Sequence, residues 1–206
     1  MRKTVTTRAK SDKGRHSAQS ILEAAEQVLI HKGYSNLSLR KVAEKAGQTL
    51  GSLQYYYPNK GALIAAMLDA AIGRYLDMFE QIRRDAGDDP QSQFVHLIQG
   101  ITFDLNDSFT TLFFPELWSM ANHDLQATKL MDKMYGRYRS VLQEVITLMN
   151  PKLTDVQVER LALFISASLE GHTVFIGHGK PWKKETANIA NMATQSFVWL
   201  IREGKI

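Results

Sequence analysis

The chain has 206 residues, of which 44% are hydrophobic and 22% are charged, and it contains no cysteine. This composition is sufficient for a globular core, and the missing thiols exclude disulfides and cysteine-based metal or nucleophile chemistry. No run of about 18 apolar residues occurs, so no membrane span is expected. The basic N-terminus also lacks the apolar stretch of a secretory signal. We therefore expect a soluble cytoplasmic protein with no membrane partner.

The charge is divided unevenly along the chain. Residues 1–63 hold 11 Lys and Arg against 4 Asp and Glu, a net charge of +7, and residues 64–206 hold 14 against 17, a net charge of −3. A small basic segment ahead of a larger, nearly neutral one is typical of a polyanion-binding N-terminal domain followed by a larger domain with a different function. The alternative is that the basic terminus is a solvated tail.

Apolar residues recur at three- and four-residue steps, which predicts an all-α protein of about nine helices. The first helix begins near residue 16 and ends at Gly33, a C′ glycine. Ser38 caps a short second helix that Gly47 ends, and Thr49 caps a third helix of about two turns. Helices this short are unstable alone, so we expect the three to pack together. The second and third have the spacing of a helix-turn-helix.

The rest of the chain is also predicted to be helical. Pro58-Asn59 ends the third helix, and Asn59 caps a long fourth helix that extends to about Ile82, ahead of a turn at 85–90. Pro115 is expected either in the first turn of its helix or at a kink. Five further helices are predicted after that turn, with a loop over 177–185 between the last two: 94–105, 109–121, 124–149, 154–176 and 186–203.

The third helix suits insertion into a DNA groove. In a helix-turn-helix the second helix lies in the major groove and presents its N-terminal side chains to the bases. The Thr49 cap and the free N–H groups behind it suit a phosphate, and Gly51 lets the backbone approach the DNA closely. Leu53 is expected to enter the core. Ser52, Gln54 and Tyr55 then face bases and phosphates.

Three consecutive tyrosines close this helix. We expect Tyr55 to point outward, Tyr56 to lie at the boundary and Tyr57 to point inward. Lys60, in the first turn of the fourth helix, suits a further phosphate. Taken alone, the same residues could equally form an aromatic core turn in an ordinary helical protein.

The segment "LSLRKVAEKAGQTLGSLQYYYPNKGALI" resembles the DNA-binding signature of the TetR family of one-component transcriptional regulators. The resemblance covers about residues 16–65, and the chain matches the signature at Ser38, Val42, Ala43, Ala46, Gly47, Thr49, Gly51, Leu53, Tyr56, Tyr57, Lys60 and Leu63. It implies a homodimeric regulator, most often a repressor, that binds a palindromic DNA operator and is released by a small-molecule effector.

Three positions depart from the family pattern. Gln48 stands where a small apolar residue is common, Leu50 where the residue is often polar or basic, and Gln54 where tyrosine is frequent. Leu50 could contact a thymine methyl group, and Gln54 could pair with adenine.

The complete set of predicted DNA contacts includes Arg15, which matches a position where family members touch the DNA backbone. The set is Arg15, Ser38, Gln48, Thr49, Leu50, Gly51, Ser52, Gln54, Tyr55, Tyr56 and Lys60. Further basic residues of the arm are expected either to lie in a minor groove or to raise affinity: Arg2, Lys3, Arg8, Lys10 and Lys13.

The resemblance also implies the domain organisation. It gives a basic arm over 1–15, a helix-turn-helix domain over 16–62 and a ligand-binding and dimerisation domain over 63–206. The last two helices are expected to form a four-helix dimer interface with a second copy. The alternative is that they close the core of the protomer. The predicted interface residues are Leu161, Ile165, Leu169, Phe175, Met192, Phe197 and Leu200.

Residues 103–138 are rich in aromatic residues and methionine, which favours an adaptable apolar cavity for a partly apolar effector. A carboxylate in such a cavity would suit a cationic or hydrogen-bonding ligand. The alternative is that these residues are ordinary core. The predicted lining residues are Phe103, Asp107, Phe113, Phe114, Glu116, Trp118, Tyr135, Tyr138 and Glu170.

The patterns of common catalytic sites do not occur. The six histidines never pair at i, i+3 or i, i+4, no Glu-x-x-His occurs, and G-x-S-x-G is absent. We therefore predict a protein that is not an enzyme, with no catalytic residues, no metal site and no cofactor. The competing hypotheses are a small-molecule scavenger, a protein–protein adaptor, or an activator or ligand-independent repressor whose cavity is filled by side chains.

Overall fold

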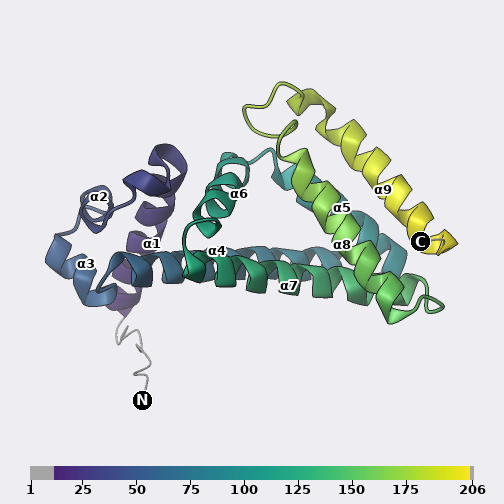
Figure 1. Cartoon of the computed structure of the whole chain (residues 1–206), viewed down its shortest axis with the longest axis horizontal. Helices are drawn as coiled ribbons and strands as arrows, with labels where there is room; N and C mark the ends of the chain where they lie inside the picture. The colour runs from purple at the N-terminus through teal and green to yellow at the C-terminus, as the bar shows by residue number, and fades with distance from the viewer. Residues whose placement is uncertain (1–11, 205–206) are drawn as a thin grey trace, which may run out of the picture. The chain divides into compact units, whose positions relative to one another are not determined.

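A computed structural model of the protein describes residues 12–204 (Figure 1). Over this range the structure holds nine α-helices and two short 3₁₀ helices and no strand, which confirms the all-α prediction. The α-helices are α1 (Asp12–Lys32), α2 (Leu39–Lys45), α3 (Leu50–Tyr56), α4 (Lys60–Asp85), α5 (Pro90–Asp104), α6 (Ser108–Ala121), α7 (Leu125–Met149), α8 (Asp155–His172) and α9 (Thr186–Glu203). The 3₁₀ helices are Tyr34–Asn36 and Lys183–Glu185.

The helix ends follow the capping residues that the sequence indicates. Ser38 accepts a hydrogen bond from the Lys41 N–H at 3.3 Å, and Thr49 accepts one from the Ser52 N–H at 3.1 Å. Gly33 has a φ of 75°, and Gly47 has a φ of 64°. Side chains other than glycine seldom adopt such angles, so these two glycines end α1 and α2 where predicted.

Three helix boundaries differ from the prediction by four residues. α5 begins at Pro90 and not at residue 94, because Asp89 caps it and proline suits the first turn of a helix. α1 begins at Asp12, so Arg15 lies within its first turn rather than before it, and it forms an ion pair with Asp12. α8 ends at His172 and not at residue 176. The segment beyond it is rich in β-branched residues, which have low helix propensity, and it continues as turns. Arg2, Lys3, Arg8 and Lys10 of the predicted arm lie outside the described residues, and Lys13 lies in α1.

The chain packs as two compact units. The head unit comprises Met1–Ile72 and Pro115–Met131, described from Asp12 onward, and the body unit comprises Gly73–Phe114 and Asp132–Ile206, described as far as Gly204. Helices α4, α6 and α7 each contribute residues to both units. Pro115 lies inside α6, where the division between the units also falls. The predicted domain boundary after residue 62 stays a prediction.

The head unit has its own core, in which α1 packs against α2 and α3. Its centre is formed by fully buried side chains from α1, α2, α3 and the start of α4: Ile21, Leu29, Val42, Leu53 and Leu63. As predicted, Leu53 is the side chain of α3 that enters this core, and its exposed fraction is 0%.

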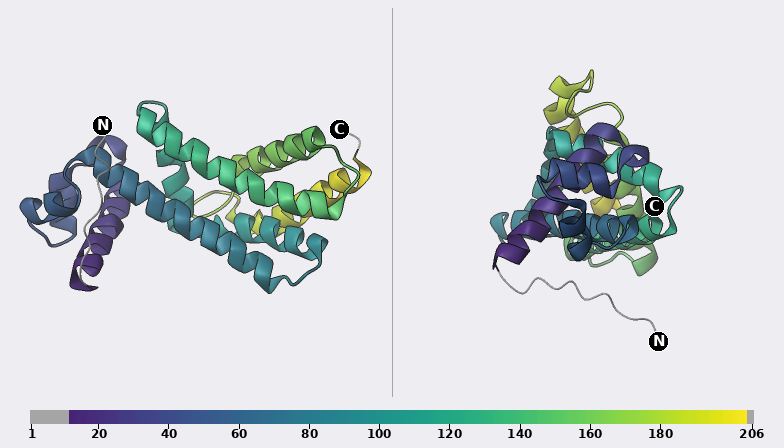
Figure 2. Two further views of the ribbon diagram at one scale, coloured as in Figure 1. Left: turned by 90° about the horizontal axis from the view of Figure 1, so that it is seen from below. Right: turned by 90° about the vertical axis from the view of Figure 1, so that its left-hand side faces the viewer.

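In the body unit, α9 packs along α5, and α8 contacts both helices (Figures 1 and 2). Four of the predicted dimer-interface residues, Leu161, Ile165, Leu169 and Phe197, are buried in the core of this unit. Leu200 is partly buried against the same core. The core of the protomer therefore accounts for these five residues, and both helices also carry apolar residues on a second, exposed side. Phe175 and Met192 are exposed. No helix of residues 12–204 is long and apolar enough to cross a membrane.

Candidate DNA-binding surface and effector cavity

α3 presents an almost wholly exposed surface. Thr49, Leu50, Gly51, Ser52, Gln54 and Tyr55 are all exposed, and Leu53 is the buried exception within the helix. This single segment of the head unit therefore offers a hydroxyl, an amide, a phenol and an apolar side chain to a partner. Such a mixture suits base edges and phosphates in a DNA groove.

The tyrosine triplet is divided as predicted. Tyr55 is 72% exposed, Tyr56 is half-buried, and Tyr57 is 4% exposed. The Tyr57 hydroxyl donates a hydrogen bond to the Ala18 carbonyl at 3.3 Å, and burial raises the pKa of Tyr57 to about 12. Tyr57 thus ties α3 to α1, and Tyr55 is free to reach outward.

Gly51 is not required by the packing of the chain. A Cβ atom at this position would meet no other atom within 4 Å, and its backbone is not in the left-handed region. Gly47 differs, because its positive φ restricts the residue type there. Gly51 therefore leaves the backbone of α3 open to the outside of the protein.

Several of the predicted DNA contacts make side-chain hydrogen bonds within the head unit, among them Gln48 and Ser38. The Gln48 side-chain amide donates to the Ser17 carbonyl at 3.4 Å and to the Ser20 hydroxyl at 3.3 Å, and its oxygen accepts from the Ser52 hydroxyl at 3.0 Å. Ser38 serves as the cap of α2. These bonds hold the helix-turn-helix together, a use that the sequence pattern did not distinguish from DNA contact.

Lys60 lies at a junction centred on Tyr34. Its ammonium group donates to the Tyr34 carbonyl at 3.3 Å and lies 4.2 Å from the centre of the Tyr34 ring. The Tyr34 N–H donates to Glu116 of α6 at 3.0 Å, and the Tyr34 hydroxyl donates to Asp124, just before α7, at 3.3 Å. Tyr34 therefore links the loop after α1 to the parts of α4, α6 and α7 that belong to the head unit.

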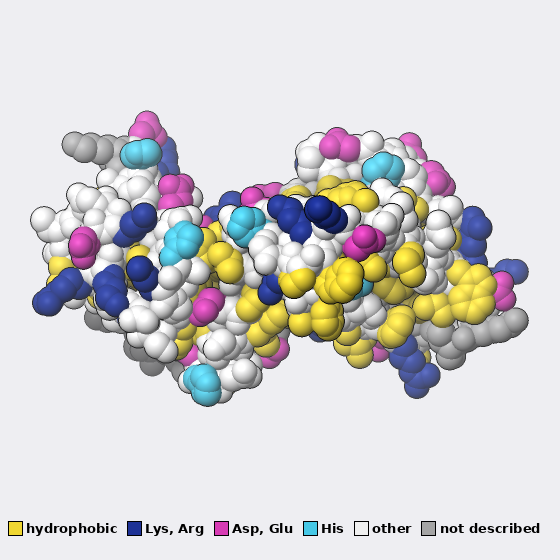
Figure 3. All heavy atoms as spheres, turned by 90° about the horizontal axis from the view of Figure 1, so that it is seen from above, with side chains coloured by type: hydrophobic (Ala, Val, Ile, Leu, Met, Phe, Trp, Pro, Cys, Tyr) yellow, Lys and Arg dark blue, Asp and Glu magenta, His cyan; other side chains and the backbone are white. Residues whose placement is uncertain are grey.

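Exposed basic residues on α2 add to the charge of the head. Arg40, Lys41 and Lys45 are all exposed, and Val42 and Ala43 between them are buried. Figure 3 shows Lys and Arg side chains gathered on this unit. The sequence analysis missed these three residues as candidate contacts, although their placement opposite a buried pair was a readable signal.

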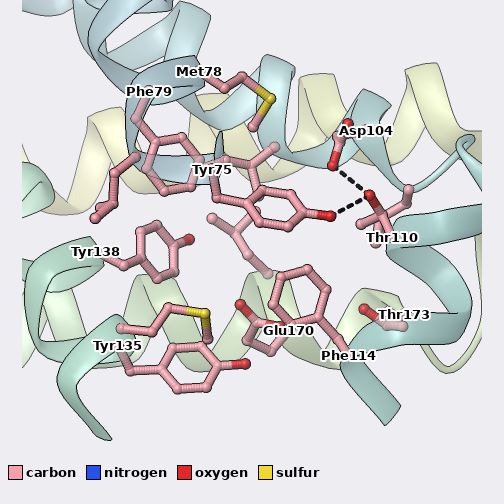
Figure 4. Close-up of a pocket in the computed structure, with 15 residues that line it drawn as sticks. Tyr75, Met78, Phe79, Asp104, Thr110, Phe114, Tyr135, Tyr138, Glu170 and Thr173 are labelled. Carbon is pink, nitrogen blue, oxygen red and sulfur yellow. Dashed lines mark hydrogen bonds between the residues drawn. The ribbon is translucent and has the colours of Figure 1, made fainter. Parts of the chain in front are cut away.

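The body unit contains one cavity with a mixed aromatic and acidic lining, drawn in Figure 4. Helices α4, α5, α6, α7 and α8 all contribute side chains to it. The lining residues are Tyr75, Leu76, Met78, Phe79, Ile101, Asp104, Leu105, Thr110, Phe114, Met134, Tyr135, Tyr138, Leu169, Glu170 and Thr173.

Four of the nine predicted lining residues face this cavity: Phe114, Tyr135, Tyr138 and Glu170. The other five do not. Phe103 is 44% exposed, Phe113 is fully buried elsewhere, and Asp107 lies at a shallower hollow beside Arg74 and Phe109. Glu116 and Trp118 belong to the head unit.

The sequence analysis missed the contribution of α4 to the cavity. Tyr75, Met78 and Phe79 share one side of this helix, at spacings of three and four residues. That spacing was a signal in the sequence, but it is equally typical of ordinary core.

Hydrogen bonds order one side of the cavity. The Tyr75 hydroxyl and the Thr110 hydroxyl lie 2.7 Å apart, and Thr110 donates to the Asp104 carboxylate at 2.7 Å (Figure 4). Burial raises the pKa of Asp104, although the bond from Thr110 opposes this rise. Burial also raises the pKa of Tyr75 well above its ordinary value.

The opposite side of the cavity carries Glu170. Burial raises the pKa of this carboxyl group to about 7, although a hydrogen bond from Tyr135 opposes the rise. Tyr138 is 4% exposed, and its buried hydroxyl has no hydrogen-bond partner. Burial raises the pKa of Tyr138 as well, so this hydroxyl stays protonated at neutral pH.

The cavity is small in this structure. The space open to the centre of a water molecule is about 40 Å³, which is enough for a few waters. Organic ligands of ordinary size occupy pockets of about 300–1,000 Å³. A ligand must therefore displace side chains to enter, and Met78 and Met134 in the lining are flexible enough to move.

Comparison with known proteins places the chain among regulators. Residues 21–67 match the family "Bacterial regulatory proteins, tetR family". An uncharacterised HTH-type transcriptional regulator in the dhlA 5′ region of Xanthobacter autotrophicus is 28% identical over 163 residues, which cover 76% of this chain and 77% of the relative.

Two solved structures share the fold. A TetR transcription regulator from Haloarcula marismortui has a TM-score of 0.68 at 18% identity, covering 92% of this chain and 96% of its own. The regulator FadR from Bacillus subtilis, in complex with stearoyl-CoA, has a TM-score of 0.68 at 16% identity, covering 91% and 99%. The helix-turn-helix with its exposed α3, the family match over residues 21–67 and the shared fold together support a TetR-family transcriptional regulator, a DNA-binding protein and not an enzyme.

Proposed function

We propose that the protein is a homodimeric repressor that binds an inverted-repeat operator through α3 and leaves it when a small-molecule effector enters the cavity of the body unit. The exposed surface of α3 carries this proposal. Six consecutive or near-consecutive residues there are exposed to solvent. The proposed contacts are Thr49, Leu50, Gly51, Ser52, Gln54 and Tyr55, with Tyr56 at their edge.

The junction at Tyr34 narrows the set of DNA contacts. Lys60, Gln48 and Ser38 are half-buried and make hydrogen bonds within the head unit, so we assign them to the positioning of α3 and not to direct DNA contact. Arg40, Lys41 and Lys45 supply exposed positive charge. We propose them as phosphate contacts, which would make binding strongly dependent on salt.

Dimerisation requires an apolar surface on each protomer, and α8 and α9 offer one. Val156, Leu163 and Phe164 of α8 are 54–57% exposed, and Met192 and Trp199 of α9 are 64% and 59% exposed. They recur at spacings of seven or eight residues along each helix, so each set lies on one face. This face replaces the buried residues of the sequence prediction as the proposed interface. Figure 3 shows hydrophobic side chains gathered on the body unit.

A twofold dimer matches an inverted repeat because each protomer reads one half-site. Successive half-sites on one face of B-DNA lie about 34 Å apart, so the two α3 helices need a similar separation. An effector that prefers a dimer with a different separation shifts the population away from DNA in proportion to that preference. α4 suits this coupling, because it lines the cavity at Tyr75 and begins at Lys60 in the head unit.

Selection from random duplex DNA, followed by titration of the selected sequence, tests the DNA-binding role. We expect an inverted repeat to be enriched. The variant Tyr55→Ala should weaken binding at least about tenfold, as loss of a direct contact does, with an unchanged melting temperature because the ring is exposed. Gln54→Ala should weaken binding selectively at one base position. The matched control is Gln126→Ala, an exposed glutamine of the same unit. Enrichment of no repeat, or wild-type binding by Tyr55→Ala, would refute the assignment.

Sedimentation of surface variants tests the dimer. Leu163→Glu should give monomers at concentrations where the wild type is dimeric, because a carboxylate cannot be buried unpaired in an apolar interface. Leu148→Glu on α7 alters a leucine of equal exposure, 57%, and should remain dimeric. If Leu163→Glu sediments as the wild type does, the proposed interface is wrong.

We also propose that the protein acts in the cytoplasm, where it has access to both DNA and small-molecule metabolites.

A further inference from the structure

The cavity of the body unit is surrounded by aromatic rings. Tyr75 and Phe114 lie 5.0 Å apart between ring centres, Phe79 and Tyr138 lie 5.4 Å apart, and Tyr135 and Tyr138 lie 6.4 Å apart. These rings come from α4, α6 and α7. Aromatic faces carry partial negative charge and attract cations within about 6 Å of the ring centre.

The charged groups that line this cavity are acidic. Asp104 and Glu170 are lining residues, and no described Lys, Arg or His lines the cavity itself. Arg74 lies in the adjoining hollow, which shares Asp104 with the cavity but does not include Glu170. The Asp104 carboxylate accepts a hydrogen bond from the Thr110 hydroxyl. Glu170 accepts a hydrogen bond from Tyr135 but faces no cation across the cavity. A buried carboxylate without a counter-charge is costly, so the ionised form of Glu170 lacks a positive charge to balance it.

An unpartnered hydroxyl points into the same space. The Tyr138 hydroxyl is buried and makes no hydrogen bond within the described chain, and Figure 4 shows it directed toward the centre of the cavity, on the side of Glu170. A buried polar atom without a partner costs about 1–3 kcal/mol. A ligand with an N–H group could give this oxygen the hydrogen bond that it lacks.

We propose that the effector is an organic cation with an apolar or aromatic body, whose ammonium group lies between Glu170 and the rings of Tyr75, Phe114 and Tyr138. This inference rests on the proposed function, since it names the ligand of the same cavity. Glu170 provides the counter-charge, and Tyr138 accepts a hydrogen bond when the ammonium group carries N–H. The apolar body occupies the space that Met78 and Met134 vacate.

The same lining disfavours anions. A carboxylate or phosphate in this cavity would face Asp104 and Glu170 with no basic side chain to balance it. The Bacillus subtilis relative was solved with stearoyl-CoA, which carries several phosphates. The acidic lining of this chain therefore favours a ligand of the opposite charge.

Four fluorescent probes with one common body test the charge preference. The two cations are (2-naphthylmethyl)trimethylammonium and 2-naphthylmethylamine, the neutral probe is 2-naphthalenemethanol, and the anion is the carboxylate 2-naphthaleneacetate. Each is titrated into the full-length protein at pH 8 without DNA. We expect the two cations to bind at least tenfold more tightly than the alcohol, and the acetate to bind most weakly. Equal affinity of the cation and the alcohol, or tighter binding of the acetate, overturns the proposal.

Two variants assign the residues. Glu170→Gln keeps the shape of the side chain but removes the charge, and it should weaken both cations at least tenfold while the alcohol changes less than twofold. Tyr138→Phe should weaken the primary amine severalfold and leave the trimethylammonium probe unchanged, because that probe has no N–H to donate. Asp77→Asn, which alters an exposed carboxylate of the same unit, is the matched control. Circular dichroism verifies that each variant is folded. A Glu170→Gln protein that binds the cations as the wild type does contradicts the proposal.

The pH dependence gives an independent readout. The ionised form of Glu170 binds the cation, and burial raises its pKa to about 7. Binding of the trimethylammonium probe should therefore strengthen up to about tenfold per pH unit toward pH 7 and level off above it. The other titratable groups around Glu170 are Tyr75 from α4, Asp104 from α5, Tyr135 and Tyr138 from α7, and His172 on α8. Glu170→Gln should remove the dependence near pH 7, and a dependence that persists in this variant assigns it to another group.

The outcomes separate this inference from the proposed function. Selection of an inverted repeat by a protein that binds all four probes alike leaves a DNA-binding regulator whose effector is of another class. If the protein binds the cations selectively and through Glu170 but selects no DNA sequence, the proposed ligand class is supported and the proposed role as an operator-binding repressor is refuted.

Discussion

The DNA-binding surface and the effector cavity are built in opposite ways. The surface comes from one continuous segment, residues 49–55, whose exposure follows from a two-turn helix anchored by Leu53. The cavity takes its lining from five helices between Tyr75 and Thr173. A local surface can be predicted from spacing, because one helix fixes the direction of each side chain. A cavity requires the relative placement of helices, and spacing within each helix does not supply it.

The two sites also differ in what their polar groups do within the protein. In the head unit, Gln48 and Lys60 have hydrogen-bond partners within the chain. In the body unit, the Tyr138 hydroxyl has none in the described residues. A partner that binds α3 adds contacts to a surface whose half-buried polar groups already have hydrogen bonds. A ligand in the cavity can instead supply the hydrogen bond that the Tyr138 hydroxyl lacks in the folded protein.

The largest effect is expected from the anchor of α3. Leu53→Ala should reduce the free energy of unfolding of the head unit by about 3 kcal/mol, the cost of truncating a fully buried leucine. Amide hydrogen exchange within α1–α3 measures this change, and DNA binding should fall with it. Leu50→Ala, at 37% exposure, is the control and should change stability by less than about 0.5 kcal/mol. Equal losses in the two variants would mean that α3 is not held by Leu53.

Glu170 gives the next largest effect, and it depends on pH. Burial raises its pKa from 4.5 to about 7, so between these values the folded protein retains a proton that the unfolded chain has released. Its stabilising contribution is complete below pH 4.5 and is lost as the pH rises through 7. At about 1.4 kcal/mol per pH unit, the loss approaches about 3 kcal/mol.

Urea unfolding of Glu170→Gln as a function of pH measures this loss. The variant should exceed the wild type in stability at pH 8 and match it near pH 4.5, and Asp77→Asn, at an exposed carboxylate of α4, should follow the wild type throughout. A constant difference between Glu170→Gln and the wild type would show that the carboxyl group titrates normally in the folded state.

The smallest effect concerns Lys60, which the sequence analysis placed on DNA and the structure places against Tyr34. Lys60→Met should lower the stability of the head unit by about 1 kcal/mol, through loss of a hydrogen bond and a cation–π contact. The slope of log affinity against log salt should stay the same, because no phosphate contact is lost. A slope reduced by about one unit would show that Lys60 contacts a DNA phosphate. Lys45→Met, which alters an exposed lysine of α2, is the comparison in which that reduction is expected.

Much of the head could be predicted from sequence because its determinants are local. Gly33 and Gly47 end α1 and α2 through positive φ angles, and Ser38 and Thr49 cap the starts of α2 and α3. Tyr55 and Tyr56 differ in exposure because successive residues of a helix point about 100° apart, and Tyr57 is the extended residue that follows α3. The start of α1 was misplaced by four residues, because a polar segment has no apolar period to mark the first turn.

The sequence by itself determined an all-helical protein, a helix-turn-helix with an exposed recognition helix, and an aromatic, methionine-rich segment suited to a cavity. The tertiary structure decided which aromatic residues share that cavity, which acidic residue faces it, and which sides of α8 and α9 remain exposed. Helical periodicity defines the faces of a helix but not their partners. Phe103 and Tyr75 are equally aromatic, and the packing of five helices leaves one at the surface and places the other beside the cavity.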